Sequence, residues 1–176
     1  MNRSWVLPAA VFVLVAAVAH ALTLSKLPSV IMTRAIDTMA ERGVPLHQFV
    51  VAPRATPESQ SVVRSSPDVA YSVCRFDLSR GPVLVQGAPW DSYGSLNVYD
   101  GQTDNVVGFD LGPETPVVTG TVIGLAKHKD HPVPEGMRFQ VLSSPKGLAL
   151  IRRVAPTDAY YAMAEEAAKG DICRPL

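Results

Sequence analysis

The sequence of 176 residues has no excess of either charge, only two cysteines and a single long hydrophobic run. Its 16 basic and 16 acidic side chains give a formal net charge of zero, so the basic field that draws proteins onto nucleic acid is missing. The signatures of G-x-S-x-G hydrolases, H-E-x-x-H metalloproteases, P-loop enzymes and G-x-G-x-x-G dinucleotide folds are also absent from it. We therefore expect no nucleic acid partner, and the sequence calls for no cofactor.

The long hydrophobic run lies at the N-terminus. Residues 5–24 carry no formal charge, and about 20 residues at 1.5 Å each cross a hydrocarbon core of roughly 30 Å. Ala19-His20-Ala21 also fits a signal peptidase site, so residues 1–25 are either a transmembrane signal anchor or a cleaved signal peptide. Both interpretations export the rest of the chain, and Arg3 favours an N-inside anchor that meets the membrane through residues 5–24. If the run is retained, His20 needs a polar partner or a place near the interface.

The two cysteines are Cys74 and Cys173, 99 positions apart. In an exported protein an even pair is more often a disulfide than two free thiols, so we expect a bond that ties the chain end to the middle of the domain. The alternative, Cys74 as a nucleophile, requires a nearby base and a thiolate, for which the sequence gives no sign.

A second helix is predicted just after the membrane segment. Pro28 should end the first helix and Ser29 should cap a juxtamembrane helix within residues 26–46, before Gly43 and Pro45 stop it. Its apolar residues recur at helical spacing: Met32, Ala35, Ile36, Met39 and Ala40. We expect this stripe to pack on the protein's own domain, with a bilayer or partner contact as the alternative.

Residues 47–176 have the sequence pattern of one antiparallel β-domain. Short apolar runs alternate with Gly- and Pro-containing turns, and no helical pattern of ten residues separates them, which argues against a parallel sheet. The predicted strands are Val69–Phe76, Val83–Gly87, Gly94–Tyr99, Val106–Asp110, Val117–Ile123, Met137–Ser143 and Leu148–Val154, with Gln48–Ala52 as an additional candidate. A terminal helix follows, capped by Thr157 and closed by Gly170, with an apolar stripe of Tyr160, Met163, Ala164 and Ala167.

Few side chains offer chemistry. Asp77 and Asp100 each follow a predicted strand, where a carboxylate commonly accepts hydrogen bonds from turn N–H groups; only if the two converge do they form an acid/base pair or a cation site. His128 and His131 flank Asp130 in a weak zinc pattern, but neighbouring lysines and prolines favour a solvated loop. The adjacent pair Arg152-Arg153 fits a surface ion pair better than an anion site.

The segment 67–100 carries the pattern PD-x-x-YS, FDLS-x-GPV-x-V, P-x-x-x-YxSL-x-x-YD. Its principal residues are Tyr71, Phe76, Leu78, Gly81, Pro82, Leu96 and Tyr99. This pattern resembles the DUF1254 family, in particular its short, membrane-anchored bacterial members, which lack the second domain called DUF1214. The resemblance implies a jelly-roll-like β-sandwich or barrel in the periplasm and no established activity.

The same residues have a structural interpretation. We expect a hairpin, turned at Ser79–Pro82, that buries one face: Tyr71, Phe76, Leu78, Val83 and Val85. Leu96 and Val98 should join them in the core.

Three functions remain open from the sequence. The favoured one is a non-catalytic module on the inner membrane that binds a protein or another envelope component. The second is a small hydrolase-like envelope enzyme that uses Asp77, Asp100, His128 and His131. The third is a carrier of an apolar or glycan ligand, which requires a cavity of about 300 Å³ or more.

Overall fold

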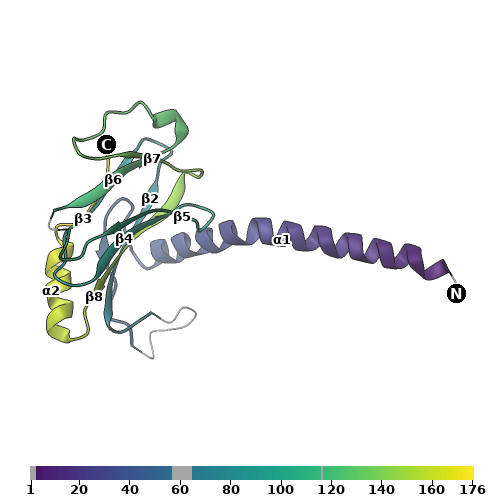
Figure 1. Cartoon of the computed structure of the whole chain (residues 1–176), viewed down its shortest axis with the longest axis horizontal. Helices are drawn as coiled ribbons and strands as arrows, with labels where there is room; N and C mark the ends of the chain where they lie inside the picture. The colour runs from purple at the N-terminus through teal and green to yellow at the C-terminus, as the bar shows by residue number, and fades with distance from the viewer. Residues whose placement is uncertain (1–2, 57–64, 116) are drawn as a thin grey trace.

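The N-terminal part of the chain forms one long helix. The computed structural model describes residues 3–56, 65–115 and 117–176, in which a short 3-10 turn, η1 (Arg3–Trp5), leads into α1 (Val6–Glu41). With 36 residues, α1 is about 54 Å long. Figure 1 shows it projecting away from the β-domain, and only its last turns reach the domain.

The predicted helix break at Pro28 is wrong, because Pro28 lies inside α1. A proline removes one backbone hydrogen bond, and the residues around it keep helical geometry. Ser29 does not cap a new helix; its hydroxyl donates to the Lys26 carbonyl at 2.9 Å. There is therefore no separate juxtamembrane helix in the described residues. The apolar N-terminal segment and the turns that pack on the domain belong to one continuous helix.

The end of α1 matches the prediction. Gly43 has a φ of +81°, the left-handed conformation that commonly terminates a helix, and its N–H donates to the Ala40 carbonyl at 3.0 Å. On the domain side, Met32 and Ile36 are 5% and 8% exposed, and the helix contacts β8. Two residues of the predicted stripe therefore pack on the protein's own domain, whereas Ala40 of that stripe is exposed.

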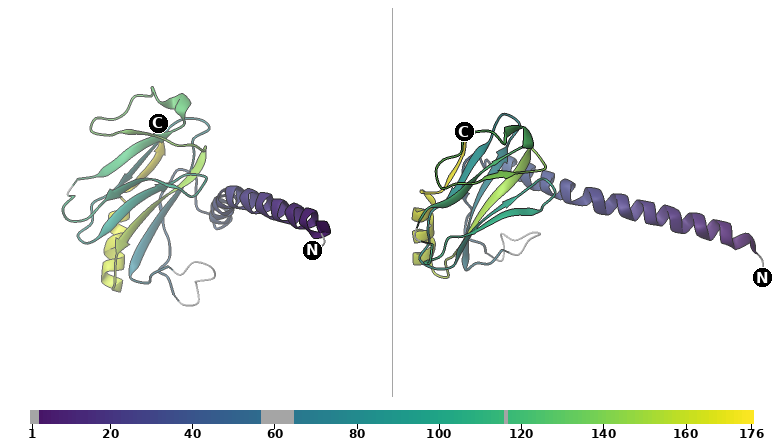
Figure 2. Two further views of the ribbon diagram at one scale, coloured as in Figure 1. Left: turned by 45° about the vertical axis from the view of Figure 1, so that its right-hand side comes forward. Right: turned by 45° about the horizontal axis from the view of Figure 1, so that its top comes forward.

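Two stacked sheets form the body of the domain (Figures 1 and 2). The first sheet has the order β1 (Val50–Val51), β2 (Val69–Asp77), β8 (Lys146–Val154), β4 (Gly94–Tyr99) and β5 (Asn105–Asp110). The second has the order β7 (Phe139–Val141), β6 (Thr119–Gly124), β3 (Val83–Gly87) and β9 (Ile172–Pro175). This is the predicted mainly β, sandwich-like domain, although β9 had no clear sequence signal.

Two features of the strand pairing differ from the prediction. The β6–β7 pair is parallel, so the domain is not wholly antiparallel; the long connection through η3 (Ala126–His128) allows the chain to return in the same direction. In addition, β2 and β3 do not form a hairpin. The turn at Ser79–Pro82 carries the chain from one sheet to the other, where β2 pairs with β1 and β8, and β3 pairs with β6 and β9.

Alternation along the strands builds the core. Cys74, Phe76 and Leu78 are at most 1% exposed and point between the sheets. Tyr71 was predicted to join them but has the opposite parity, so it lies half-buried on the outer face, where its hydroxyl accepts a hydrogen bond from the Ser66 N–H at 3.0 Å. The remaining predicted core residues are fully buried: Val83, Val85, Leu96 and Val98.

The terminal helix α2 (Asp158–Ala168) starts where the sequence predicts. The Thr157 hydroxyl accepts a hydrogen bond from the Tyr160 N–H at 3.3 Å. The buried face is shifted by one position, because Tyr161 replaces Tyr160 beside Ala164, and Tyr160 and Met163 are over 40% exposed. This face packs on Ala70 and Trp90 in a second, smaller cluster.

Candidate functional site

Asp100 is a structural carboxylate. The residue is 3% exposed, and its Oδ1 atom accepts hydrogen bonds from the N–H groups of Gln102 and Asp104 at 2.7 and 3.2 Å. Its Oδ2 atom accepts the Ser143 hydroxyl at 2.5 Å. The Oδ1 atom therefore stabilises the turn after β4, and the Oδ2 atom links this turn to the chain before β8.

Asp77 lies at the end of β2 and fastens the next turn. Its Oδ1 atom accepts the Ser79 N–H at 2.9 Å. Burial raises the pKa of Asp77, but the Ser79 hydrogen bonds, together with the charge of Lys146, outweigh burial and lower the pKa overall. An acid held ionised in this way is a poor proton donor at neutral pH.

The two aspartates are not brought together. Asp77 is paired in register with Lys146 of β8, whereas Asp100 follows β4 on the other side of that strand. The two carboxylates also have separate hydrogen-bond partners, which are Ser79 for Asp77, and Gln102, Asp104 and Ser143 for Asp100. The arrangement provides no acid/base pair from these two residues.

The side chains of His128 and His131 contact backbone atoms of their own loop. The Nδ1 atom of His128 accepts the Leu125 N–H at 3.3 Å, and Nδ1 of His131 lies 2.9 Å from the Pro132 carbonyl oxygen. Within residues 3–56, 65–115 and 117–176, no three His, Cys, Asp or Glu side chains gather in a way that could hold a metal ion. His47 is an additional structural histidine that the sequence did not indicate, since its Nε2 accepts the Asp77 N–H at 2.9 Å.

The predicted disulfide is confirmed. Cys74 and Cys173 are bonded, with Cα atoms 6.5 Å apart, and both residues are buried. Because Cys74 lies in β2 and Cys173 in β9, the bond joins the two sheets. It leaves no free cysteine in the described residues to act as a nucleophile.

The prediction of a surface ion pair at Arg152-Arg153 is wrong for Arg153. The Arg153 side chain is 1% exposed and forms a two-pronged ion pair with Asp171, whose side chain is fully buried. The inward position of Arg153 follows from its parity with Ile151, a signal that was present in the strand pattern. Arg152, on the outer face, donates to the Tyr99 hydroxyl at 3.4 Å.

A groove of about 430 Å³ lies between β1, β9 and the C-terminal end of α2. Phe49, Val51 and Ile172 supply its apolar walls. Its charged lining residues are Glu165, Lys169 and Asp171. No sequence motif marked this groove, because its residues come from three separate parts of the chain. The groove thus combines apolar walls with charged side chains.

Comparison with known proteins identifies the family. Residues 46–175 match the model of the "Protein of unknown function (DUF1254)" family. The chain belongs to the DUF1254 family. Its DUF1254 domain thus starts just after α1 and includes the groove, the disulfide and the buried ion pair.

One solved structure shares the fold, and a second is more distantly similar. The VPA0106 protein of Vibrio parahaemolyticus is 17% identical, with a TM-score of 0.61 over 80% of this chain and 33% of its own. An uncharacterised protein of Burkholderia cenocepacia is 13% identical, with a TM-score of 0.49 over 80% of this chain and 37% of its own. The DUF1254 chain thus spans about one third of the length of these proteins. No functionally curated protein matches it.

Proposed function

We propose that the protein is a single-pass, membrane-anchored binding module whose DUF1254 domain lies in the bacterial periplasm. In this proposal α1 crosses the inner membrane, and the domain acts by holding a protein or another envelope component. The buried disulfide supports an oxidising compartment, since such bonds persist outside the cytoplasm.

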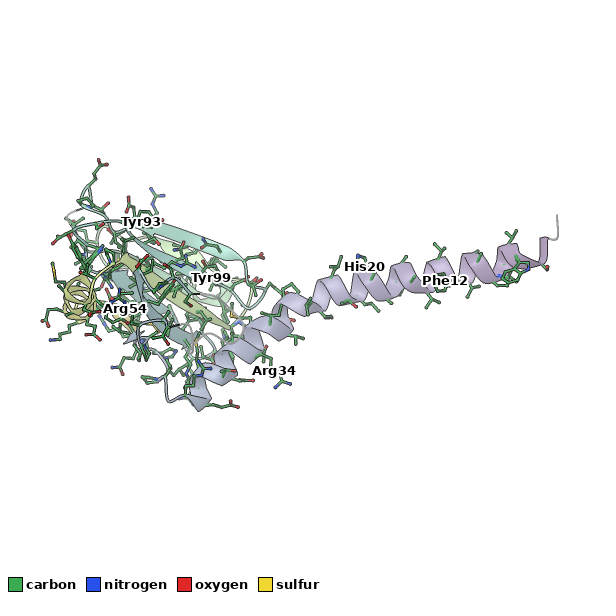
Figure 3. The ribbon with its side chains drawn as sticks, turned by 90° about the horizontal axis from the view of Figure 1, so that it is seen from below. Phe12, His20, Arg34, Arg54, Tyr93 and Tyr99 are labelled. Carbon is green, nitrogen blue, oxygen red and sulfur yellow. A yellow bond between two sulfur atoms is a disulfide. The ribbon has the colours of Figure 1, made fainter. Side chains whose placement is uncertain are left out.

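The observation that carries the proposal is the unbroken, uncovered apolar surface of α1. It is the one helix in the described residues that is long and apolar enough to cross a membrane, and none of its most apolar window is buried by the domain. Figure 3 shows Phe12 and His20 on this free part, whereas Arg34 lies where α1 reaches the domain. A bilayer supplies the apolar environment that this surface lacks in water.

Retention of α1 fits the structure better than cleavage after Ala21. A mature chain starting at Leu22 would keep five apolar side chains that are 47–59% exposed: Leu22, Leu24, Leu27, Val30 and Ile31. So much exposed apolar surface on one short stretch of helix is costly in water and ordinarily marks a contact surface. In the anchored protein the same side chains continue the membrane segment toward the domain.

Binding is favoured over catalysis by the roles of the candidate side chains. Asp77, Asp100 and His128 accept hydrogen bonds from backbone N–H groups of their own turns. The interior between the sheets is filled by side chains that are almost fully buried, which disfavours a carrier with a ligand inside the sandwich. We also propose a jelly-roll-like topology, because β2, β3 and β4 alternate between the two sheets.

Protease accessibility tests the placement of the domain. Spheroplasts that produce the full chain should be treated with proteinase K, and their membranes should be washed with alkaline carbonate. The proposal predicts that carbonate leaves the protein in the membrane and that the protease degrades the domain without lysis. A domain that is protected until the spheroplasts are lysed, or released by carbonate, would contradict the proposal.

A further inference from the structure

The groove is the open corner of the sandwich. β1 is an edge of the first sheet, with β2 as its partner, and β9 is an edge of the second, with β3 as its partner. The disulfide between Cys74 of β2 and Cys173 of β9 places both edges on the same side of the molecule. The groove between them is closed at one end by the last turn of α2, where Ala168 and Lys169 contribute to the lining.

Main-chain groups of both edges face this corner. The Ala52 N–H donates to Tyr71 of β2, and bonding alternates along an antiparallel pair, so the N–H and C=O of Val51 point away from β2. The Leu176 N–H likewise donates to the Pro82 carbonyl, so the main-chain groups of Cys173 point away from β3. Within residues 3–56, 65–115 and 117–176, neither edge has a second partner strand, and such edges are templates for an added strand.

The charges of the groove leave one carboxylate without a cation. Lys169 lies 2.5 Å from Glu166, and Asp171 is held by the buried Arg153. Glu165 is exposed and has no ion-pair partner among the residues that the structure describes. A ligand that carries a positive charge next to an apolar group therefore complements this lining.

We infer that the groove binds an extended polypeptide segment of a partner protein as an added strand. Main-chain hydrogen bonds to Val51 and Cys173 hold the segment, an aliphatic side chain packs on Phe49 and Ile172, and a Lys or Arg side chain pairs with Glu165. This inference rests on the proposed binding function and names its site and partner class. Pro175 has no N–H, so the added strand is short on the β9 side.

The position of the groove suits an extracytoplasmic partner. Figures 1 and 2 show α2 on the side of the domain opposite to the projecting α1. With α1 in the membrane, the end of α2 that borders the groove faces away from the bilayer. A partner segment therefore reaches the groove without entering the membrane.

Defined peptides test the inference on the full chain in lipid nanodiscs. One blocked peptide alternates Val and Arg, a second alternates Val and Glu, and a third is the Val–Arg peptide with N-methylated amides. Backbone NMR of the ¹⁵N-labelled protein should show shifts at Val51 and Cys173 with the Val–Arg peptide. We expect binding of the Val–Glu peptide to be weaker by about fivefold or more, and the N-methylated peptide not to bind.

Variants separate the groove from the rest of α2. Ala168→Trp fills the groove and should abolish binding of the Val–Arg peptide, whereas Ala162→Trp, on an exposed part of the same helix, should leave it unchanged. Glu165→Gln should weaken binding by about two- to fivefold, as expected for a single exposed ion pair. A native amide spectrum of each variant confirms that it is folded.

Three results would overturn the inference. The first is no binding of the Val–Arg peptide, and the second is binding that Ala168→Trp does not affect. The third is a shift of Val51 and Cys173 on concentrating the protein without peptide, which would assign the groove to a second copy of the chain. If the groove fails but photo-crosslinkers on another face trap a periplasmic partner, the site is wrong and the proposed binding function stands.

Discussion

Arg153 and Asp171 form a buried, two-pronged ion pair between β8 and the segment that joins α2 to β9. The two Arg153–Asp171 contacts measure 2.9 and 2.6 Å, and the side chains are 1% and 0% exposed. The same carboxylate accepts the Ala88 N–H, and the guanidinium donates to the Ala88 carbonyl. The pair thus joins three separate parts of the chain beside the groove.

Removal of one member of this pair should be strongly destabilising. Asp171→Ala leaves a buried guanidinium without its counter-charge, which should lower the free energy of unfolding by about 3–5 kcal/mol in urea titrations. The double variant Arg153→Met, Asp171→Leu should be more stable than Asp171→Ala, because no charge stays buried. The control is Asp158→Ala at the exposed Arg54–Asp158 pair, and equal losses in control and test would contradict this account.

Loss of the disulfide should destabilise the domain through the unfolded state. The double variant Cys74→Ala, Cys173→Ala opens a loop with a sequence separation of 99, for which chain entropy predicts a loss of about 4–5 kcal/mol. Urea unfolding with and without reductant measures the effect. The oxidised wild type should have the higher midpoint, and the double variant should be insensitive to reductant; identical midpoints for all samples would refute the prediction.

Aromatic truncations should distinguish the two faces of β2. Phe76 is 1% exposed between the sheets, so Phe76→Ala should cost about 3–5 kcal/mol of unfolding free energy. Tyr71 lies half-buried on the outer face, and Tyr71→Ala should cost clearly less. Thermal or urea unfolding of both variants gives the order, and a larger loss for Tyr71→Ala would show that the register assigned to β2 is wrong.

The ionised Asp77 should contribute pH-dependent stability. Its pKa in the folded domain is lowered from 3.8, so its contribution is present above that value and is lost as pH falls through the lower, folded pKa. The stability difference between wild type and Asp77→Asn should therefore be full at pH 7 and shrink in acid below about pH 3.8. A difference that stays constant between pH 7 and pH 2 would contradict the role given to this carboxylate.

The sequence predicted features that depend on local chemistry. The apolar span, the Thr157 cap and most strand positions follow from spacing and turn residues, and the disulfide follows from export and an even cysteine count. Which strands pair with each other was not predictable in this way. β2 pairs with β8, about 75 residues away, rather than with β3, because pairing depends on which faces can be buried across the whole sandwich.

Two errors arose where tertiary contacts override a local rule. Pro28 usually ends a helix, but α1 continues through it, and Met32 and Ile36 pack on the domain beyond it. Arginines are mostly exposed, but Arg153 is buried because Asp171 and Ala88 satisfy most of its donors. The groove could not be predicted at all, since it forms only when β1, α2 and β9 come together.

The central claim, that α1 is retained as a membrane anchor, is tested most directly by peptide mapping of the protein purified from membranes. Trypsin cuts after Arg3 and Lys26, so a retained anchor yields the intact peptide Ser4–Lys26, which spans the Ala21–Leu22 bond. The account predicts this peptide as the main N-terminal product. A semi-tryptic peptide that starts at Leu22, with Ser4–Lys26 absent, would contradict it.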